Sequence, residues 1–199
     1  MDRIIFATTN EGKMKEIRMI LGDLDMEILS LKDAGIHADI VEDGTTFEEN
    51  AVIKATAIQK IAGGIVLADD SGLEVDYLGG APGVYSARYM GEDTSYDIKN
   101  QAIIDQLADA KGDERSARFV CAIAAAFPDG SVRITRATIE GRIGYEICGD
   151  GGFGYDPIFF VPELNKTSAQ ISAEEKNLIS HRGKALRAMK EIIKEYISK

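Results

Sequence analysis

Cysteine and histidine are scarce in this chain, with two residues of each among 199. Cys121 and Cys148 form neither a CxxC pair nor a dense cysteine framework, so the pattern excludes a disulfide scaffold. The two histidines lie too far from them in sequence to suggest a zinc site. We expect both thiols to be reduced and partly buried, which favours a cytoplasmic protein.

Long apolar runs are also missing. No stretch reaches the roughly 18 apolar residues that indicate a membrane-spanning helix. Residues 1–6 lack the extended apolar segment and cleavage site that are typical of a signal peptide. We therefore expect neither a membrane span nor a secretory leader.

Basic residues are in deficit, with 23 Lys and Arg against 33 Asp and Glu, which gives a formal net charge of −10. A field of that sign repels nucleic-acid polymers and anionic membranes, and the sequence has no basic stripe. A small anionic ligand is still allowed, because it needs only local cations, a helix N-terminus or a metal ion. The charge balance therefore favours a small-molecule site served by a divalent cation.

The length suits a single domain over residues 1–199 or two closely joined lobes. Hydrophobic periodicity and turn residues predict an α/β fold. The expected strands cover 3–8, 65–68, 115–127, 131–140, 143–147 and 157–161. The expected helices cover 13–21, 46–62, 94–110 and 172–198, the last broken near Ser180. This order predicts a three-layer α/β protein with a mixed sheet, without fixing the strand order.

The first segment that could carry chemistry is the turn Thr8, Thr9, Asn10, Glu11, Gly12 and Lys13. A strand leads directly into a helix here, so free backbone N–H groups and the helix dipole would attract an anion. Lys13 on the first helical turn could meet a phosphate. The segment is not a Walker A loop, and an ordinary helix cap beside a surface lysine would give the same pattern.

Acidic residues form the second segment. Asp69 and Asp70 follow an apolar strand, where adjacent carboxylates repel each other unless a cation or donor lies nearby. We expect them at the carboxyl end of that strand, which is where α/β proteins bind ligands. Glu42 lies on a separate acidic stretch, and two carboxylates from different segments suit Mg²⁺. Glu48 and Glu49 begin a helix, so dipole pairing explains them.

The run Gly149 to Gly154 is a literal GxGxxG. The dinucleotide fingerprint requires a strand before the glycines and a helix after them, whereas the sequence here continues as a predicted strand. A plain flexible turn is one interpretation. The other is a backbone that approaches a flat ligand, with Phe153 or Tyr155 stacking on a base.

The last segment surrounds Ser180, which could cap the final helix. Cations at His181 and Arg182 would oppose the helix dipole unless an anion or an electron-rich ligand compensates them. Arg182 could donate to a purine carbonyl, and Lys176 could stack or donate a hydrogen bond. A Ser-His-Asp hydrolase built on Ser71 and His181 is disfavoured, because the sequence has no GxSxG elbow.

Six motifs in a fixed order give the chain a resemblance to a known family. They are TTNEGK at 8–13, TFEENA at 46–51 followed by Lys54 and Ala55, ADDSGLEV at 68–75, GGAPGVYSAR at 79–88, GFGYDPIF at 152–159 and SHRGKAL at 180–186. Together they resemble the Ham1-like family of inosine and xanthosine triphosphate pyrophosphatases over almost the whole chain. The one mild departure is EDGT at 42–45, which keeps the glutamate of the family's Glu-Thr-Gly.

The resemblance implies an elongated α/β fold with a cleft between two lobes, a homodimer and a Mg²⁺ requirement. It implies hydrolysis of ITP, dITP and XTP to the monophosphate and pyrophosphate, which removes deaminated purines from the nucleotide pool. Residues 8–13 would bind the triphosphate with help from Lys54, and Ser71 would contact the substrate. Glu42 and Asp70 would hold magnesium, with Asp70 also acting as general base. The base pocket would consist of Phe153, Gly154, Tyr155, Asp156, Lys176, His181 and Arg182.

Two other classes of function remain open at this stage. A non-catalytic nucleotide sensor would need the phosphate-binding turn but not Glu42 and Asp70 together. A Maf-like pyrophosphatase would act on pyrimidine or modified nucleotides, and the Ser180-His181-Arg182 segment argues against it. For a purine enzyme, discrimination should depend on the 6-position, where hypoxanthine and xanthine present an acceptor and adenine presents a donor.

Overall fold

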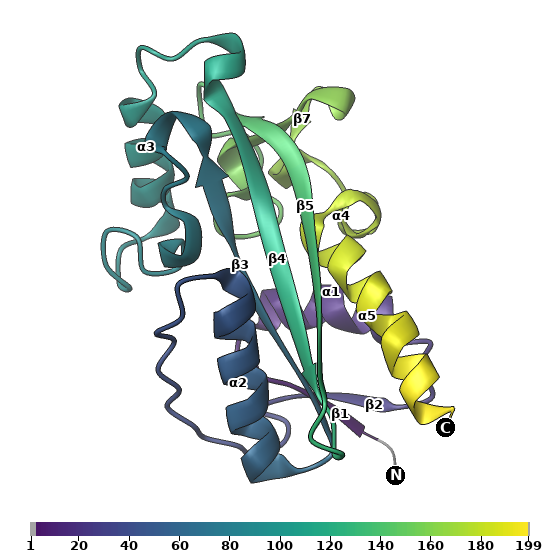
Figure 1. The fold of residues 1–199 in the computed structure, drawn as a ribbon. Helices are drawn as coiled ribbons and strands as arrows, with labels where there is room; N and C mark the ends of the chain where they lie inside the picture. Colours follow the sequence, from purple (N-terminus) through teal and green to yellow (C-terminus); the bar gives the residue numbers. More distant parts are fainter. Residues whose placement is uncertain (1–2, 199) are drawn as a thin grey trace. The chain divides into compact units, whose positions relative to one another are not determined.

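The structure, a computed structural model, describes residues 3–198 and contains one mixed seven-stranded sheet flanked by helices (Figure 1). Its strands are β1 (Arg3–Phe6), β2 (Glu27–Ser30), β3 (Ile65–Val75), β4 (Ser116–Ala126), β5 (Val132–Ile143), β6 (Phe159–Val161) and β7 (Lys166–Thr167). They are ordered β2-β1-β3-β4-β5-β6-β7. β1 runs parallel to β2 and β3, whereas β6 runs antiparallel to β5 and β7. The predicted α/β class with a mixed sheet is confirmed.

Five α-helices begin and end close to the expected signals. They are α1 (Glu11–Leu21), α2 (Phe47–Ala62), α3 (Tyr96–Gln106), α4 (Ala173–Ile179) and α5 (His181–Ile197). Asn10 caps α1 by accepting the Lys13 N–H, and Thr46 forms a capping box with Glu49 at the start of α2. The break at Ser180 separates α4 from α5 as predicted. None of the helices within residues 3–198 is long and apolar enough to cross a membrane.

Three expectations about the strands were wrong. β3 does not end at Ala68 but continues to Val75, so Asp69 and Asp70 lie within the strand. β5 ends at Ile143, and no strand covers the rest of the predicted segment 143–147. A 3₁₀ turn over Asp156–Ile158 precedes β6, which replaces the first part of the predicted strand 157–161.

The chain forms two compact units. The first comprises Met1–Asp70, Cys121–Ala137 and His181–Lys199 as far as these ranges are described. Its core packs α1 and α5, which lie side by side (Figure 1), against one face of β1, β3 and β4. Side chains on a strand alternate between its faces, so Ile65 and Leu67 of β3 join this core. Asp69 continues that series and Asp70 points to the opposite face.

The second unit comprises Ser71–Val120 and Thr138–Ser180. Its core contains apolar side chains from α3, from the C-terminal half of β3, from the N-terminal half of β4 and from β6. These are Leu73, Val75, Ile103, Ile104, Leu107, Ala110, Ala117, Phe119, Ile143, Tyr155, Ile158, Phe159 and Val161. Both cysteines are free, with Cys121 buried in the first unit and Cys148 half-buried in the second.

Candidate functional site

The turn before α1 presents its polar side chains at the surface of the first unit. Thr8 is half-buried, whereas Thr9, Asn10, Glu11 and Gly12 are exposed. The Thr8 hydroxyl accepts the Asn10 N–H at 3.1 Å, and the Asn10 side chain accepts the Lys13 N–H at 3.0 Å. These two bonds fix the turn and leave it beside the positive end of the helix dipole, as an anion site requires.

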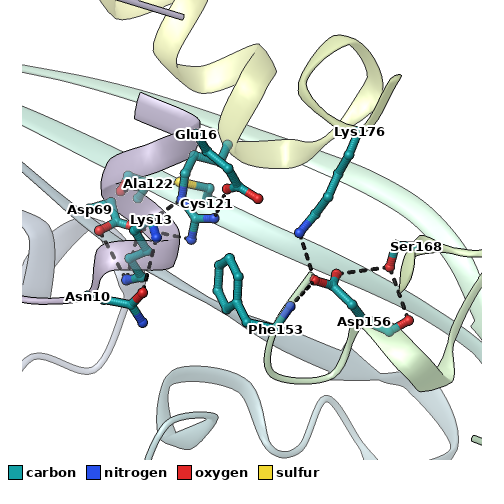
Figure 2. A network of polar contacts seen from close by, with 11 residues as sticks. Asn10, Lys13, Glu16, Asp69, Cys121, Ala122, Phe153, Asp156, Ser168 and Lys176 are labelled. Carbon is teal, nitrogen blue, oxygen red and sulfur yellow. Dashed lines mark hydrogen bonds and ion pairs between the residues drawn. The ribbon is translucent and has the colours of Figure 1, made fainter. Parts of the chain in front are cut away.

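Lys13 reaches from α1 to Asp69 of β3 (Figure 2), with its Nζ 3.1 Å from Oδ1 and 3.0 Å from Oδ2. Asp69 is only 2% exposed. On its other side lies Arg182, whose Nη2 is 3.2 Å from Asp69 Oδ2. Burial alone would raise the pKa of Asp69, but the adjacent Lys13 and Arg182 hold it well below its ordinary value. Asp69 is therefore ionised at neutral pH and anchors two cations.

Arg182 also pairs with Glu16, a residue that the sequence reasoning missed. Arg182 Nη1 lies 2.6 Å from Glu16 Oε2, and both side chains are buried. Glu16 follows Lys13 by three positions, so both lie on the same face of α1. That spacing was the one available signal, since an acid on the buried face of an amphipathic helix calls for a partner. The pair holds the first turn of α5 against α1.

On the opposite face of β3, Asp70 lies among polar groups of α2 and the segment before it. Asn50 Nδ2 donates to Asp70 Oδ2 at 3.1 Å. Lys54 Nζ is 3.0 Å from Glu42 Oε2 and 4.0 Å from Asp70 Oδ1, so the structure brings both predicted carboxylates to one ammonium group. Burial raises the pKa of Asp70 above its ordinary value, although Lys54 and Asn50 oppose that shift.

Asn50, which is buried and which the sequence reasoning also missed, connects the two acidic segments. Its Oδ1 accepts the Gly44 N–H at 2.9 Å, while its Nδ2 binds Asp70. The side chain thereby fixes the Glu42 segment relative to β3. A Cβ on Gly44 would lie 2.6 Å from that same Oδ1, so the close approach depends on the glycine.

The donor chemistry around Lys54 fits a hard divalent cation. Among residues 3–198, no cluster of three or more Asp, Glu, His or Cys side chains is arranged to hold a metal by itself. Glu42 and Asp70 offer carboxylate oxygens from two segments, and Mg²⁺ is commonly held by one or two carboxylates together with substrate phosphates. Burial raises the pKa of Asp70, and a cation bound to its carboxylate would oppose that shift.

The second unit holds a different arrangement around Asp156, which is buried (Figure 2). Its Oδ2 accepts from Lys176 Nζ at 2.7 Å and from the Phe153 N–H at 2.8 Å, and its Oδ1 accepts from Ser168 Oγ at 3.0 Å. Lys176 Nζ also lies 4.7 Å from the centroid of the Phe153 ring. Gly152, with a φ of 70°, has no space for a side chain because a Cβ would overlap the Asp156 carboxylate. Gly152 thus allows the backbone of the turn to lie directly against the Asp156 carboxylate.

The two aromatic residues of this turn have different surroundings. Phe153 is half-buried. Tyr155 is 4% exposed, packs edge-on against Tyr96 at 5.2 Å and donates its hydroxyl to Ser86 O at 2.7 Å. Burial raises the pKa of the Tyr155 phenol, so it remains a donor at neutral pH. Phe153 is therefore the better placed of the two to stack on a base, while Tyr155 anchors the turn.

Three further residues from the sequence analysis are Ser71, Ser180 and His181. Ser71 follows Asp70 within β3 and is half-buried. Ser180 and His181, both buried, stand at the junction of α4 and α5. The GxGxxG run is not preceded by a strand or followed by an α-helix, which agrees with rejecting the dinucleotide interpretation.

Known proteins that this chain is similar to share its length as well as its sequence. A family model described as "Ham1 family" matches residues 4–192. The chain is 48% identical to a protein of Clostridium perfringens and 50% identical to one of Exiguobacterium sp., each named "dITP/XTP pyrophosphatase". These matches cover 98% of both chains in the first case, and 96% of this chain and 97% of the relative in the second.

Solved structures agree with this assignment. A HAM1 protein from Coxiella burnetii superposes with a TM-score of 0.88 at 40% identity, covering 98% of this chain and all of the other. The Ham1 protein of Staphylococcus aureus gives 0.87 at 39% identity over 98% of this chain. The residues around Asp69, Asp70 and Asp156 all lie within the matched range, and the chain belongs to the Ham1 family.

Proposed function

We propose that this chain hydrolyses dITP, ITP and XTP to the nucleoside monophosphate and pyrophosphate. The observation that carries the proposal is the setting of Asp70, a largely buried carboxylate with a raised pKa beside Glu42 and Lys54. That setting suits a general base that removes a proton from an attacking water. The names of the Clostridium and Exiguobacterium relatives support the choice of substrate.

The first unit supplies the phosphate and metal functions in this proposal. The turn from Thr8 to Lys13 binds the triphosphate through backbone N–H groups and the Lys13 ammonium. Lys54 adds positive charge. Ser71, the first residue of the second unit, contacts the substrate next to Asp70. Glu42 and Asp70 would hold Mg²⁺, which would supply positive charge to oppose the negative charge of the phosphate oxygens.

Asp70 has the central chemical role. Its carboxylate accepts a proton from the water that attacks the α-phosphorus. The bond between the α-phosphorus and the oxygen that bridges it to the β-phosphorus then breaks, and pyrophosphate leaves with that oxygen. Asn50 keeps one Asp70 oxygen in place, and both Lys54 and Asn50 oppose the rise in the Asp70 pKa that burial causes. No covalent nucleophile is required.

The second unit and the start of α5 supply recognition of the base. Phe153 stacks on the purine, and the turn formed by Gly154, Tyr155 and Asp156 contacts its edge, as does Lys176. His181 and Arg182, at the start of α5, are the donors that the first unit offers to the base. Hypoxanthine and xanthine present a 6-oxo acceptor to donors that adenine would leave unpaired. A mismatch of this kind costs about 1–3 kcal/mol for each buried polar group, so several together explain strong discrimination.

A nucleotide panel tests the proposal. Purified protein with Mg²⁺ is incubated with dITP, XTP, dGTP and dATP, and the products are separated by chromatography. We expect dIMP and XMP with pyrophosphate, and much slower turnover of dATP. Binding without turnover would instead support the sensor alternative, and release of dIDP with phosphate would show that the wrong bond is cut. Sedimentation of the same sample tests the expected homodimer.

A further inference from the structure

Helix α3 carries a polar stripe that begins at the exposed Tyr96 and continues to the buried Lys99 and Asn100. Tyr96, Lys99 and Asn100 lie one turn apart at positions i, i+3 and i+4, so their side chains point the same way. Lys99 and Asn100 are each 1% exposed. Burying an ammonium and an amide in a helix–core interface is unfavourable unless each group has a specific partner. Their partners therefore indicate what the stripe is for.

The stripe contacts two backbone carbonyls and one aromatic ring that belong to two loops. Asn100 Nδ2 donates to Gly154 O at 3.1 Å, and Lys99 Nζ donates to Ala87 O at 2.7 Å. Tyr96 packs against Tyr155, whose hydroxyl is bound to Ser86 O. The stripe thus holds the aromatic turn at 153–156 and the neighbouring segment at 86–87 from the same helix.

The contact from Asn100 fixes one peptide plane. Gly154 has a φ of 66°, and only glycine adopts this conformation without strain. In a trans peptide the C=O and the following N–H point in opposite directions. Because the Gly154 C=O is directed at α3, the N–H of Tyr155 is directed to the side of the turn that faces away from α3.

The contact with Gly154 O determines which way the Asn100 side-chain amide is turned. Gly154 O can only accept, so the atom facing it must be the NH₂ group. Asn100 Oδ1 then has no hydrogen-bond partner within residues 3–198. The chain keeps a buried acceptor unsatisfied in order to place a donor on Gly154, which a leucine of similar size could not do.

We propose that Asn100 is a positioning residue for purine discrimination: it sets the Gly154–Tyr155 peptide plane so that a backbone N–H meets the 6-oxo group of the base. The inference rests on the proposed function of the turn. Asn100 does not touch the substrate. Its effect is to make the turn present a donor, which favours hypoxanthine, instead of adapting to the 6-amino group of adenine.

Replacing Asn100 by leucine tests this inference. The measured quantity is the ratio of kcat/KM for dITP to kcat/KM for dATP, which differ at the purine 6-position. We expect Asn100→Leu to lower this ratio by about tenfold or more, because the freed peptide can turn its carbonyl toward the 6-amino group. The matched control is Gln101→Leu, since Gln101 is the next residue on α3 and its exposed side chain bonds only Asp105. Its ratio should equal that of the wild type.

The ratio separates positioning from damage to the fold. A partly unfolded variant loses active molecules equally for both substrates, so its ratio stays constant, and any soluble fraction suffices for the measurement. Asn100→Ala provides a second variant if the leucine protein is insoluble. A ratio within about twofold of the wild type in both Asn100 variants would overturn the inference. Wild-type protein without activity on dITP would instead overturn the proposed function itself.

Discussion

Asp69 and Asp70 are neighbours in sequence, yet their surroundings shift their pKa values in opposite directions. The alternation of side chains along β3 directs Asp69 toward α1 and α5 and Asp70 toward α2. Two cations outweigh burial at Asp69 and lower its pKa, whereas burial dominates at Asp70 and raises it. One carboxylate therefore stabilises the fold and the other is kept reactive.

The first residue-scale prediction concerns Asp69→Asn. The substitution leaves Lys13 and the buried Arg182 without a carboxylate that both contact, so the free energy of unfolding should fall by about 3–5 kcal/mol. Urea denaturation at neutral pH measures this loss. A variant as stable as the wild type would contradict the role of Asp69 as an anchor.

The contact of Asp69 with its two cations also predicts that the stability of the fold depends on pH. The folded-state pKa of Asp69 is lowered, so its contribution is fully present above the unfolded value of about 3.9 and is lost as the pH falls through the folded value. The stability difference between wild type and Asp69→Asn should thus be constant above about pH 5 and narrow progressively in stronger acid. Urea titrations along that series check the sign, which would be wrong if the difference widened in acid.

Asp70→Asn should behave in the opposite way. Because the folded-state pKa of Asp70 is raised, its ionised form costs stability at neutral pH, and the metal-free variant should be as stable as the wild type or more so. Turnover should fall by about 10²- to 10⁴-fold, as expected for loss of a general base. Thermal unfolding in EDTA and steady-state rates in Mg²⁺ supply the two readouts. Near-normal turnover would remove Asp70 from the mechanism.

At the scale of elements, the start of α2 determines where Glu42 lies. Gly44 approaches Asn50 so closely that a methyl group would meet both Asn50 Oδ1 and the Glu49 Cβ, at 2.6 and 2.8 Å. Gly44→Ala must therefore displace the segment that carries Glu42. We expect the Mg²⁺ concentration for half-maximal activity to rise, with a stability loss of about 1–3 kcal/mol from overpacking.

Thr46→Ala is the matched control for that prediction. It removes the side-chain acceptor that caps α2, at a cost of about 1 kcal/mol, but leaves the Gly44–Asn50 contact in place. Its half-maximal Mg²⁺ concentration should match that of the wild type. A similar shift in both variants would show that general loosening of α2, not displacement of Glu42, is responsible.

Local signals explain which elements the sequence could predict. Asn10, Thr46 and Gly63 act within a few residues of the helix ends that they cap, so the helices were found with small errors. β2 and β7 have four and two residues and are defined by pairing with distant strands, which leaves little periodicity to read. The true length of β3 was hidden because its two acids are compensated by cations from elsewhere in the chain.

The same distinction applies to the candidate site. Glu42 and Asp70 were expected from the acidic pattern, and Lys54 from the resemblance. The structure brings the three side chains together. Glu16, Asn50 and Asn100 were not expected, because their partners lie 166, 20 and 54 residues away in sequence. A buried polar residue on a helix indicates that it has a hydrogen-bond or ionic partner, but only the folded structure shows which residue that partner is.

At the scale of the whole molecule, a net charge of −10 must coexist with a triphosphate substrate. The structure does so by placing cations locally: Lys13 and Arg182 at Asp69, Lys54 at Asp70, and Lys176 at Asp156. A net charge of this sign is expected to repel polyanions. The account therefore expects a Mg²⁺-dependent enzyme for small nucleotides, with no affinity for nucleic-acid polymers.

The central claim is that water attacks the α-phosphorus of a 6-oxopurine triphosphate. Hydrolysis of dITP in water enriched in oxygen-18, followed by mass spectrometry of both products, tests it most directly. The account predicts one heavy oxygen in dIMP and none in the pyrophosphate as released. Heavy oxygen in the pyrophosphate, or formation of dIDP and phosphate, would contradict it.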